Sequence, residues 1–79
     1  YFNSELLLSQ VKVNLGNCYM MQNQDQKALV LLMEALGPLK KLNEARFVSR
    51  ALGYLARIHL KNGNERKALS YALESLELA

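Results

Sequence analysis

The feature that most constrains this chain is an internal repeat. Two six-residue segments, 24–29 (Gln-Asp-Gln-Lys-Ala-Leu) and 64–69 (Asn-Glu-Arg-Lys-Ala-Leu), align at an offset of 40 residues. The same register pairs Leu15 with Leu55, Glu34 with Glu74 and Leu36 with Leu76. A register kept over that distance indicates a chain built from stacked copies of one supersecondary unit.

Apolar residues recur at spacings of three and four within each unit, which predicts amphipathic helices. In the second unit the apolar face consists of Phe47, Val48, Ala51, Leu52, Leu55, Ile58 and His59. Its counterpart in the first unit consists of Leu7, Leu8, Val11, Leu15, Cys18 and Tyr19, with Lys12 standing where the second unit has Leu52. We expect both faces to be buried. Cys18 and His59 are therefore interpreted as packing residues, not as a nucleophile and a base.

Turn residues divide each unit into two helices. Asn23 and the segment 62–64 (Asn-Gly-Asn) tolerate positive φ and should end the first helix of each unit. Gly37-Pro38 should interrupt or kink the second helix of the first unit, and Asn43-Glu44 should cap the helix that follows. We expect helices at about 4–22, 25–36, 44–61 and from 65 to the C-terminus, grouped in repeat units at about 4–43 and 44–79. The predicted fold is all-α, with two antiparallel helical hairpins in a single region, 1–79.

Composition excludes several classes of function. A chain of 79 residues forms at most one domain, which leaves little room for a catalytic cleft, and its net charge of +3 is too small to indicate direct nucleic-acid binding. No apolar run approaches a membrane span, so membrane insertion is not expected. The single cysteine mildly favours a reduced, cytoplasmic setting. The sequence holds no metal-ligand cluster, phosphate loop or catalytic triad, so we expect no cofactor, no metal and no enzymatic activity.

The residues of each unit resemble a tetratricopeptide repeat. The first unit has Leu15-Gly16-Asn17 followed by Tyr19, Met20 and the segment 27–29 (Lys-Ala-Leu), and the second has Leu55-Ala56, His59, Gly63 and the segment 67–69 (Lys-Ala-Leu). Small residues stand where the two helices of such a unit cross, as Gly16 with Ala28 and Ala56 with Ala68. The period of 40 exceeds the common one of about 34. The resemblance implies a 40-residue variant of the family and a segment of a longer repeat array.

In this family the first helix of each unit lines the concave surface, where partners bind. On that helix of the second unit, Arg46, Arg50, Arg57 and Lys61 lie within about 60° of one another at 100° per residue, with Gly53 in their midst. The equivalent face of the first unit carries Gln10, Val13, Asn17 and Met20. The carboxylate clamp of chaperone-binding relatives is not reproduced, because Val13 and Tyr54 replace its lysine and asparagine.

These residues predict a scaffold or adaptor module that binds a protein or peptide, with the basic stripe facing an acidic segment of the partner. A purely architectural segment, or the sensor region of a transcription regulator or sensor kinase, is the alternative; a solvated charged helix face is the plain interpretation of the stripe. The apolar C-terminal segment, 76–79, predicts either further repeats or self-association.

Overall fold

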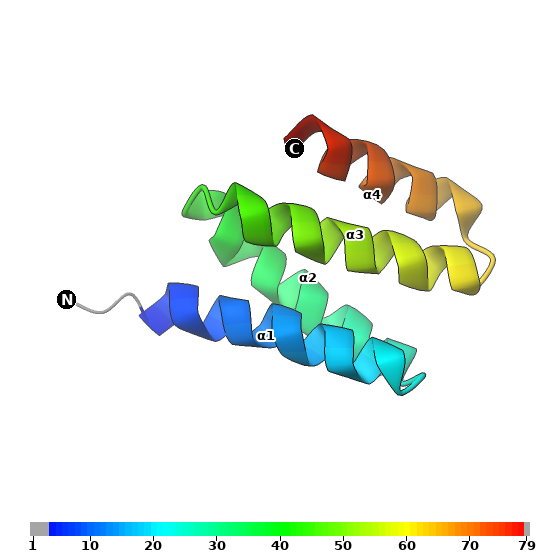
Figure 1. Ribbon diagram of the computed structural model, residues 1–79, viewed down its shortest axis with the longest axis horizontal. Coiled ribbons are helices and arrows are strands. Elements are labelled where there is room, and N and C mark those ends of the chain that lie inside the picture. The colour runs from blue at the N-terminus through cyan, green and yellow to red at the C-terminus, as the bar shows by residue number, and fades with distance from the viewer. Residues whose placement is uncertain (1–3, 79) are drawn as a thin grey trace.

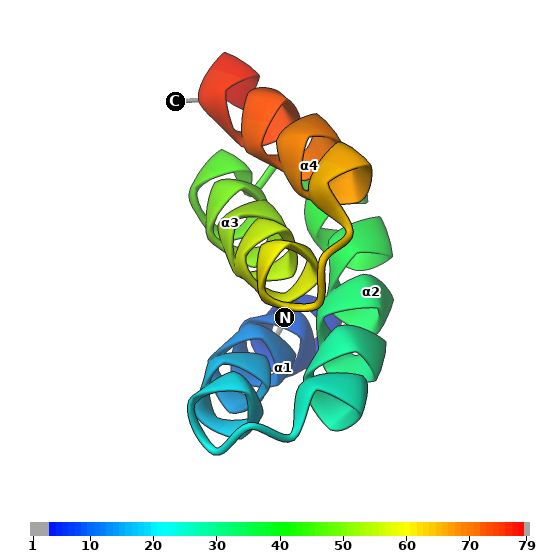
Figure 2. The same ribbon diagram turned by 90° about the vertical axis from the view of Figure 1, so that its right-hand side faces the viewer.

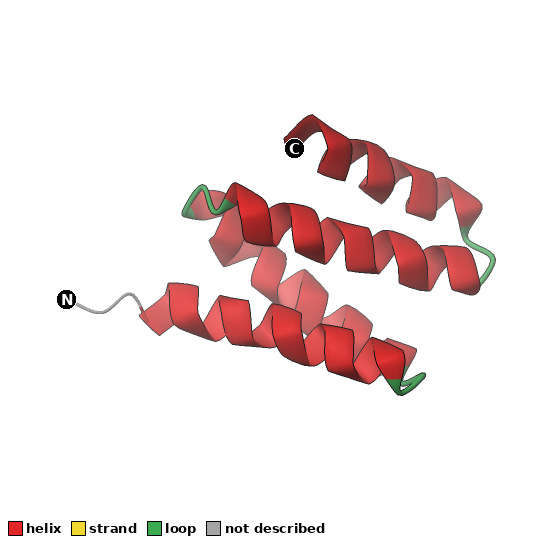
Figure 3. Cartoon of the chain, viewed as in Figure 1, coloured by secondary structure: helices red, strands yellow, loops and turns green. Residues whose placement is uncertain are grey.

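The computed structural model describes residues 4–78 and shows four helices joined by short turns (Figure 1). The helices are α1 (Ser4–Met21), α2 (Asp25–Lys41), α3 (Ala45–Lys61) and α4 (Glu65–Leu78), and the described residues contain no strand. Successive turns lie at opposite ends of the molecule, so each helix runs antiparallel to the one before it (Figure 3). The prediction of an all-α fold made of antiparallel hairpins is confirmed.

The two hairpins are stacked in two layers. We call α1 with α2 hairpin one, and α3 with α4 hairpin two. In Figure 2, α1 and α3 form one layer and α2 and α4 form the other. α3 contacts both helices of hairpin one as well as α4. The 40-residue offset in the sequence therefore corresponds to one hairpin in space.

All three turns share one backbone hydrogen-bond pattern. A residue with positive φ occupies each turn: Asn23 at 62°, Asn43 at 58° and Gly63 at 82°. The next N–H then donates to a carbonyl five residues back, from Gln24 to Tyr19 at 2.8 Å, from Glu44 to Leu39 at 3.0 Å and from Asn64 to His59 at 2.7 Å. This is the Schellman ending, in which a left-handed residue lets the last carbonyls of the helix find donors.

The predicted turn roles of Asn23 and Gly63 are confirmed, whereas the cap predicted at Asn43-Glu44 is wrong. Glu44 is the N-cap of α3 but its side chain makes no capping hydrogen bond, and the first turn of α3 has no acidic residue. Asn43 instead ends α2 in the left-handed conformation. Asparagine is common both at the N-cap of a helix and at the left-handed position that ends one, and Asn43 takes the second role here.

The predicted end of this helix at Leu36 is also wrong, because α2 continues through Gly37-Pro38 to Lys41 without interruption. A proline ring normally clashes with the Cβ of the preceding residue in a helix, and glycine has no Cβ. The last turn is held by Leu39, which is fully buried, and by the N–H of Leu42, which donates to the Pro38 carbonyl at 2.9 Å. Burial of Leu39 thus outweighs the backbone donor that Pro38 lacks.

The core lies between the layers and is centred on α3. Its largest fully buried side chains are Val13, Leu32, Leu39, Leu52, Leu55 and Ile58. The crossing of α1 and α2 is tight, since a Cβ on Gly16 would lie 2.8 Å from Cγ of Leu32 and 3.5 Å from the Ala28 carbonyl oxygen. The predicted close approach at Gly16 is therefore confirmed. None of the helices in residues 4–78 combines the length and the apolar character needed to cross a bilayer.

The predicted burial of the apolar face of α1 is wrong. Leu7, Leu8, Val11, Leu15 and Cys18 are all exposed, and α1 turns Ser9, Val13 and Gly16 to the core instead. Tyr19 is the member of the predicted face that packs against the core. The corresponding face of α3 is buried because α3 rests on hairpin one. Nothing among the described residues rests on α1 in the same way.

Substitutions at two repeat-equivalent leucines should separate these environments. Leu55→Ala removes a side chain with 0% exposure and should lower the free energy of unfolding by about 2–5 kcal/mol. Leu15→Ala removes one with 44% exposure and should cost less than about 1 kcal/mol. Urea denaturation at low protein concentration measures both. Equal losses would contradict the exposed position of Leu15.

The turns can be tested at a second pair of positions, both with open space around a new Cβ. Gly63→Ala places a Cβ on a residue with φ of 82° and should cost about 1 kcal/mol of unfolding free energy. Gly53→Ala, inside α3, should instead raise that free energy by about 0.5–1 kcal/mol, because alanine is the better helix former. A stabilising Gly63→Ala would rule out the left-handed turn.

Candidate functional site

The basic stripe lies on the solvent side of α3. Arg46, Arg50, Arg57 and Lys61 are all exposed, opposite the buried side chains of the same helix. Gly53 lies among them, and no heavy atom outside its own helix comes within 4 Å of the position that a Cβ would take. An incoming chain could therefore approach the α3 backbone closely at this point.

The arginines of the stripe carry no ion pair within residues 4–78. The ion pairs found there all use lysine: Lys12 with Glu34 at 3.2 Å, Lys40 with Glu74 at 2.8 Å and Lys61 with Asp25 at 3.5 Å. Arg50 lies over the ring of Phe47, 5.0 Å from its centroid, which fixes the guanidinium while leaving its edge donors available. The planar donors of these arginines are suited to carboxylate oxygens.

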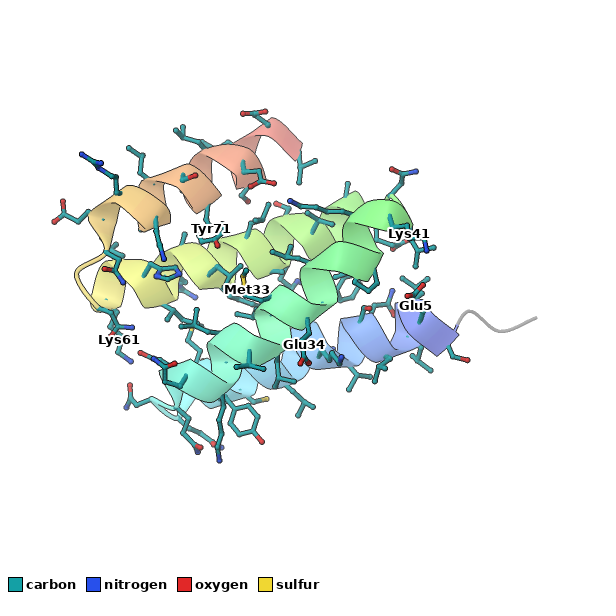
Figure 4. All side chains as sticks on the ribbon, turned by 180° about the vertical axis from the view of Figure 1, so that it is seen from behind. Glu5, Met33, Glu34, Lys41, Lys61 and Tyr71 are labelled. Atoms are coloured by element: carbon teal, nitrogen blue, oxygen red, sulfur yellow. The ribbon has the colours of Figure 1, made fainter. Side chains whose placement is uncertain are left out.

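Lys61 differs from the arginines because it holds the two hairpins together. Its Nζ donates to Oδ1 of Asn23 at 2.6 Å and to Oδ1 of Asp25 at 3.5 Å, and Nδ2 of Asn62 donates to Oδ2 of Asp25 at 3.4 Å. Figure 4 shows Lys61 at the end of α3 beside the α1–α2 turn. The candidate surface is thus formed by Arg46, Arg50, Gly53 and Arg57, with Lys61 occupied at its margin.

Hairpin one contributes less to this surface than the sequence indicated. Gln10, Asn17 and Met20 are partly exposed, and Met20 packs against the core. Val13 has 0% exposure, so it belongs to the core and not to an open surface. Its burial depends on the packing between the hairpins, which the pattern of a single helix does not contain.

Two aromatic residues at the edge of the stripe were missed. Phe47 and Tyr54 are partly buried and pack against the core. They follow Arg46 by about 100° and 80° around the helix, between the stripe and the buried face. This position between the stripe and the buried face could have identified both residues from the sequence. Aromatic rings beside arginines add apolar contact area to a surface that is otherwise polar.

His59 lies away from the stripe and links three helices. Its ring stacks on Tyr71 of α4, with centroids 5.6 Å apart and an angle of 16° between the planes. The Tyr71 hydroxyl in turn donates to Sδ of Met33 in α2 at 3.7 Å, and both residues are seen in Figure 4. The predicted role of His59 as a packed, partly buried side chain is confirmed.

Burial lowers the pKa of His59 from 6.5, and the nearby Lys67 ammonium lowers it further. The unfolded chain therefore binds this proton more readily than the folded one. Acid should destabilise the fold as pH falls through about 6.5, and this effect should level off below the lower folded-state pKa.

A thermal melt at pH 7.5 and at pH 5.5 tests this expectation. The melting temperature of the wild type should fall between the two, and His59→Phe, which keeps a ring against Tyr71, should show a smaller fall. Lys67→Gln serves as the control, because it should reduce only part of the effect. Equal falls in wild type and His59→Phe would show that His59 does not account for the pH dependence.

The residues of 4–78 include no group of three or more histidine, cysteine, aspartate or glutamate side chains placed to hold a metal ion. The chain matches no protein-family model, no curated protein and no solved structure. The surface itself is therefore the basis for assigning a function.

Proposed function

We propose that this chain is a tetratricopeptide-type repeat pair, of the 40-residue variant, that serves as a scaffold for protein binding. On this proposal the surface of α3 around Arg50, Gly53 and Arg57 binds an acidic segment of a partner. The observation that carries it is the set of exposed α3 arginines, which have no carboxylate partner in residues 4–78 and surround a position without a side chain.

The charges support an acidic partner more than a merely solvated face. Each ion pair of the described residues engages a lysine, with Glu34, Glu74 or Asp25 as its partner, and none of these pairs neutralises an arginine of the stripe. Arginine is less strongly hydrated than lysine and binds a carboxylate through two donors at once, which favours it at interfaces. Phe47 and Tyr54 on the flank would add apolar contacts for residues that lie between the acidic ones.

A purely architectural role is the second candidate, supported by the exposed apolar residues of α1 and α4. Arg57 lines one groove together with Leu60 and Leu69, so the two roles would share part of the α3 surface. We propose a non-enzymatic role in either case, as an adaptor or as the sensor region of a larger regulator, in a cytoplasmic setting that suits the free, exposed Cys18.

A peptide-display selection on the immobilised chain tests the acidic preference. We expect enrichment of segments with several aspartates or glutamates separated by apolar residues. A selected peptide is then titrated by fluorescence anisotropy against wild type and the Arg50→Ala/Arg57→Ala variant. Affinity should fall more than about tenfold, since each charge-assisted hydrogen bond contributes roughly 1.5–3 kcal/mol before screening by solvent.

Arg66→Ala/Lys67→Ala is the matched control, because it removes the same charge from exposed positions on α4. It should change affinity little, while circular dichroism should show the same helical content in all variants. Equal weakening by both double variants would reduce the effect to net charge. Enrichment of peptides without acidic residues, or an unchanged affinity of Arg50→Ala/Arg57→Ala, would favour the architectural role.

A further inference from the structure

The two hairpins provide an internal comparison that identifies surfaces used for stacking. Each hairpin has the same internal packing, α1 on α2 and α3 on α4. A difference in burial between residues 40 apart therefore reports what the neighbouring hairpin covers.

One such surface is the exposed face of α1. Leu8, Val11, Leu15 and Cys18 are exposed, whereas the residues 40 positions later, Val48, Ala51, Leu55 and Ile58, have at most 2% exposure. The α3 residues are covered because hairpin two rests on hairpin one. The α1 residues are also apolar and occupy the same positions of the repeat, but no hairpin among the described residues covers them.

The other surface is the groove between α3 and α4. It is lined by Ala56, Arg57, Leu60, Glu65, Ala68, Leu69 and Ala72, so it includes one arginine of the stripe. The residues 40 positions before its apolar members are Gly16, Met20, Ala28, Leu29 and Leu32, all of which are buried or pack against the core. Towards the end of α4, Leu76 has 71% exposure, while its equivalent Leu36 has 8%. This second surface has the form of the receiving side of an interface whose inserted side is the face of α1.

We propose that these two surfaces bind one another between copies of this chain, so that α1 of one copy lies on α3 and α4 of the next. We choose a second copy as the occupant because the chain carries both surfaces, and because equivalent surfaces already bind one another between its two hairpins. The contact is head-to-tail, with different surfaces on the two partners. A head-to-tail contact that does not close on itself adds copies without limit.

Two positions in the repeat distinguish the proposed contact from the internal one. Lys61, which ties α3 to Asp25, corresponds to Met21, and Asp25 corresponds to Glu65. Both Met21 and Glu65 are exposed. The proposed contact therefore lacks the ion pair of the internal one, although Glu65 supplies its acceptor. Met21→Lys should restore it.

Leu52, which is fully buried, corresponds to Lys12. The ammonium of Lys12 is paired with Glu34 in its own hairpin at 3.2 Å, so the mismatch is partly neutralised. Together these differences make the proposed contact weaker than the internal one. It should form reversibly as concentration rises.

Sedimentation velocity of the chain from about 1 to 300 μM tests the proposal. The average mass of the wild type should rise past twice the 9.0 kDa of one copy. Leu15→Glu and Leu76→Glu each damage one surface, and both variants alone should stay monomeric, because every head-to-tail contact needs both surfaces. An equimolar mixture of the two should form a heterodimer and stop there, since only one intact pair of surfaces remains.

Met21→Lys should tighten wild-type association by up to about fivefold, as expected for one partly exposed ion pair. Met21→Lys/Glu65→Gln should lose that gain. Circular dichroism should show that all variants keep their helices. None of these substitutions changes a residue of the arginine stripe. Arg57 also lines the α3–α4 groove, but a chain that stays monomeric would leave the acidic-segment proposal intact.

Other outcomes overturn the proposal. If Leu15→Glu is monomeric while Leu76→Glu still dimerises, α1 pairs with itself; the reverse result means that α4 does. A wild type that stays monomeric at the highest concentration excludes a second copy as the occupant, and the two surfaces then belong to other helices.

Discussion

Burial of one side of α3 is the interaction on which the rest of the structure depends. Within the described residues, α3 is the helix that contacts all three others. Its fully buried Leu52, Leu55 and Ile58 join the interior of hairpin one to that of hairpin two. Full burial of a leucine or isoleucine side chain is worth about 1.5–3 kcal/mol, so each of these residues stabilises the contact between the hairpins. Because one side of α3 is committed to this contact, the arginines on its other side are fixed in place at the surface.

Sequence reasoning placed the helices well because it used features that are local or periodic. The offset of 40 residues fixed the hairpin as the repeating unit, and asparagine or glycine marked the turns by their tolerance of positive φ. The same reasoning failed at Gly37-Pro38, where two helix-breaking residues together are compatible with a helix. Glycine removes the clash of the proline ring with the preceding Cβ, and neither residue considered alone shows this.

What covers a helix face could not be predicted from its pattern. Leu15 and Leu55 occupy the same place in the repeat, yet one is exposed and the other buried, because a hairpin lies beneath only the second. Val13 is buried for the same non-local reason. In the candidate site, the exposure of the α3 arginines follows from the helical period, whereas the engagement of Lys61 depends on Asp25, 36 residues earlier in the chain. Contacts at that separation are created by the stacking itself.

The shared geometry of the turns has a mechanical consequence. In the turns after α1 and α2, the residue that donates the last hydrogen bond of the Schellman ending, Gln24 or Glu44, is also the N-cap of the next helix. No residue therefore separates the end of one helix from the start of the next. These connections therefore cannot lengthen when the chain is stretched. The angle between the hairpins can change only by shear of α3 across hairpin one, against its interlocked side chains. The repeat pair should thus resist small extensions stiffly and, at higher force, release a whole hairpin in one step.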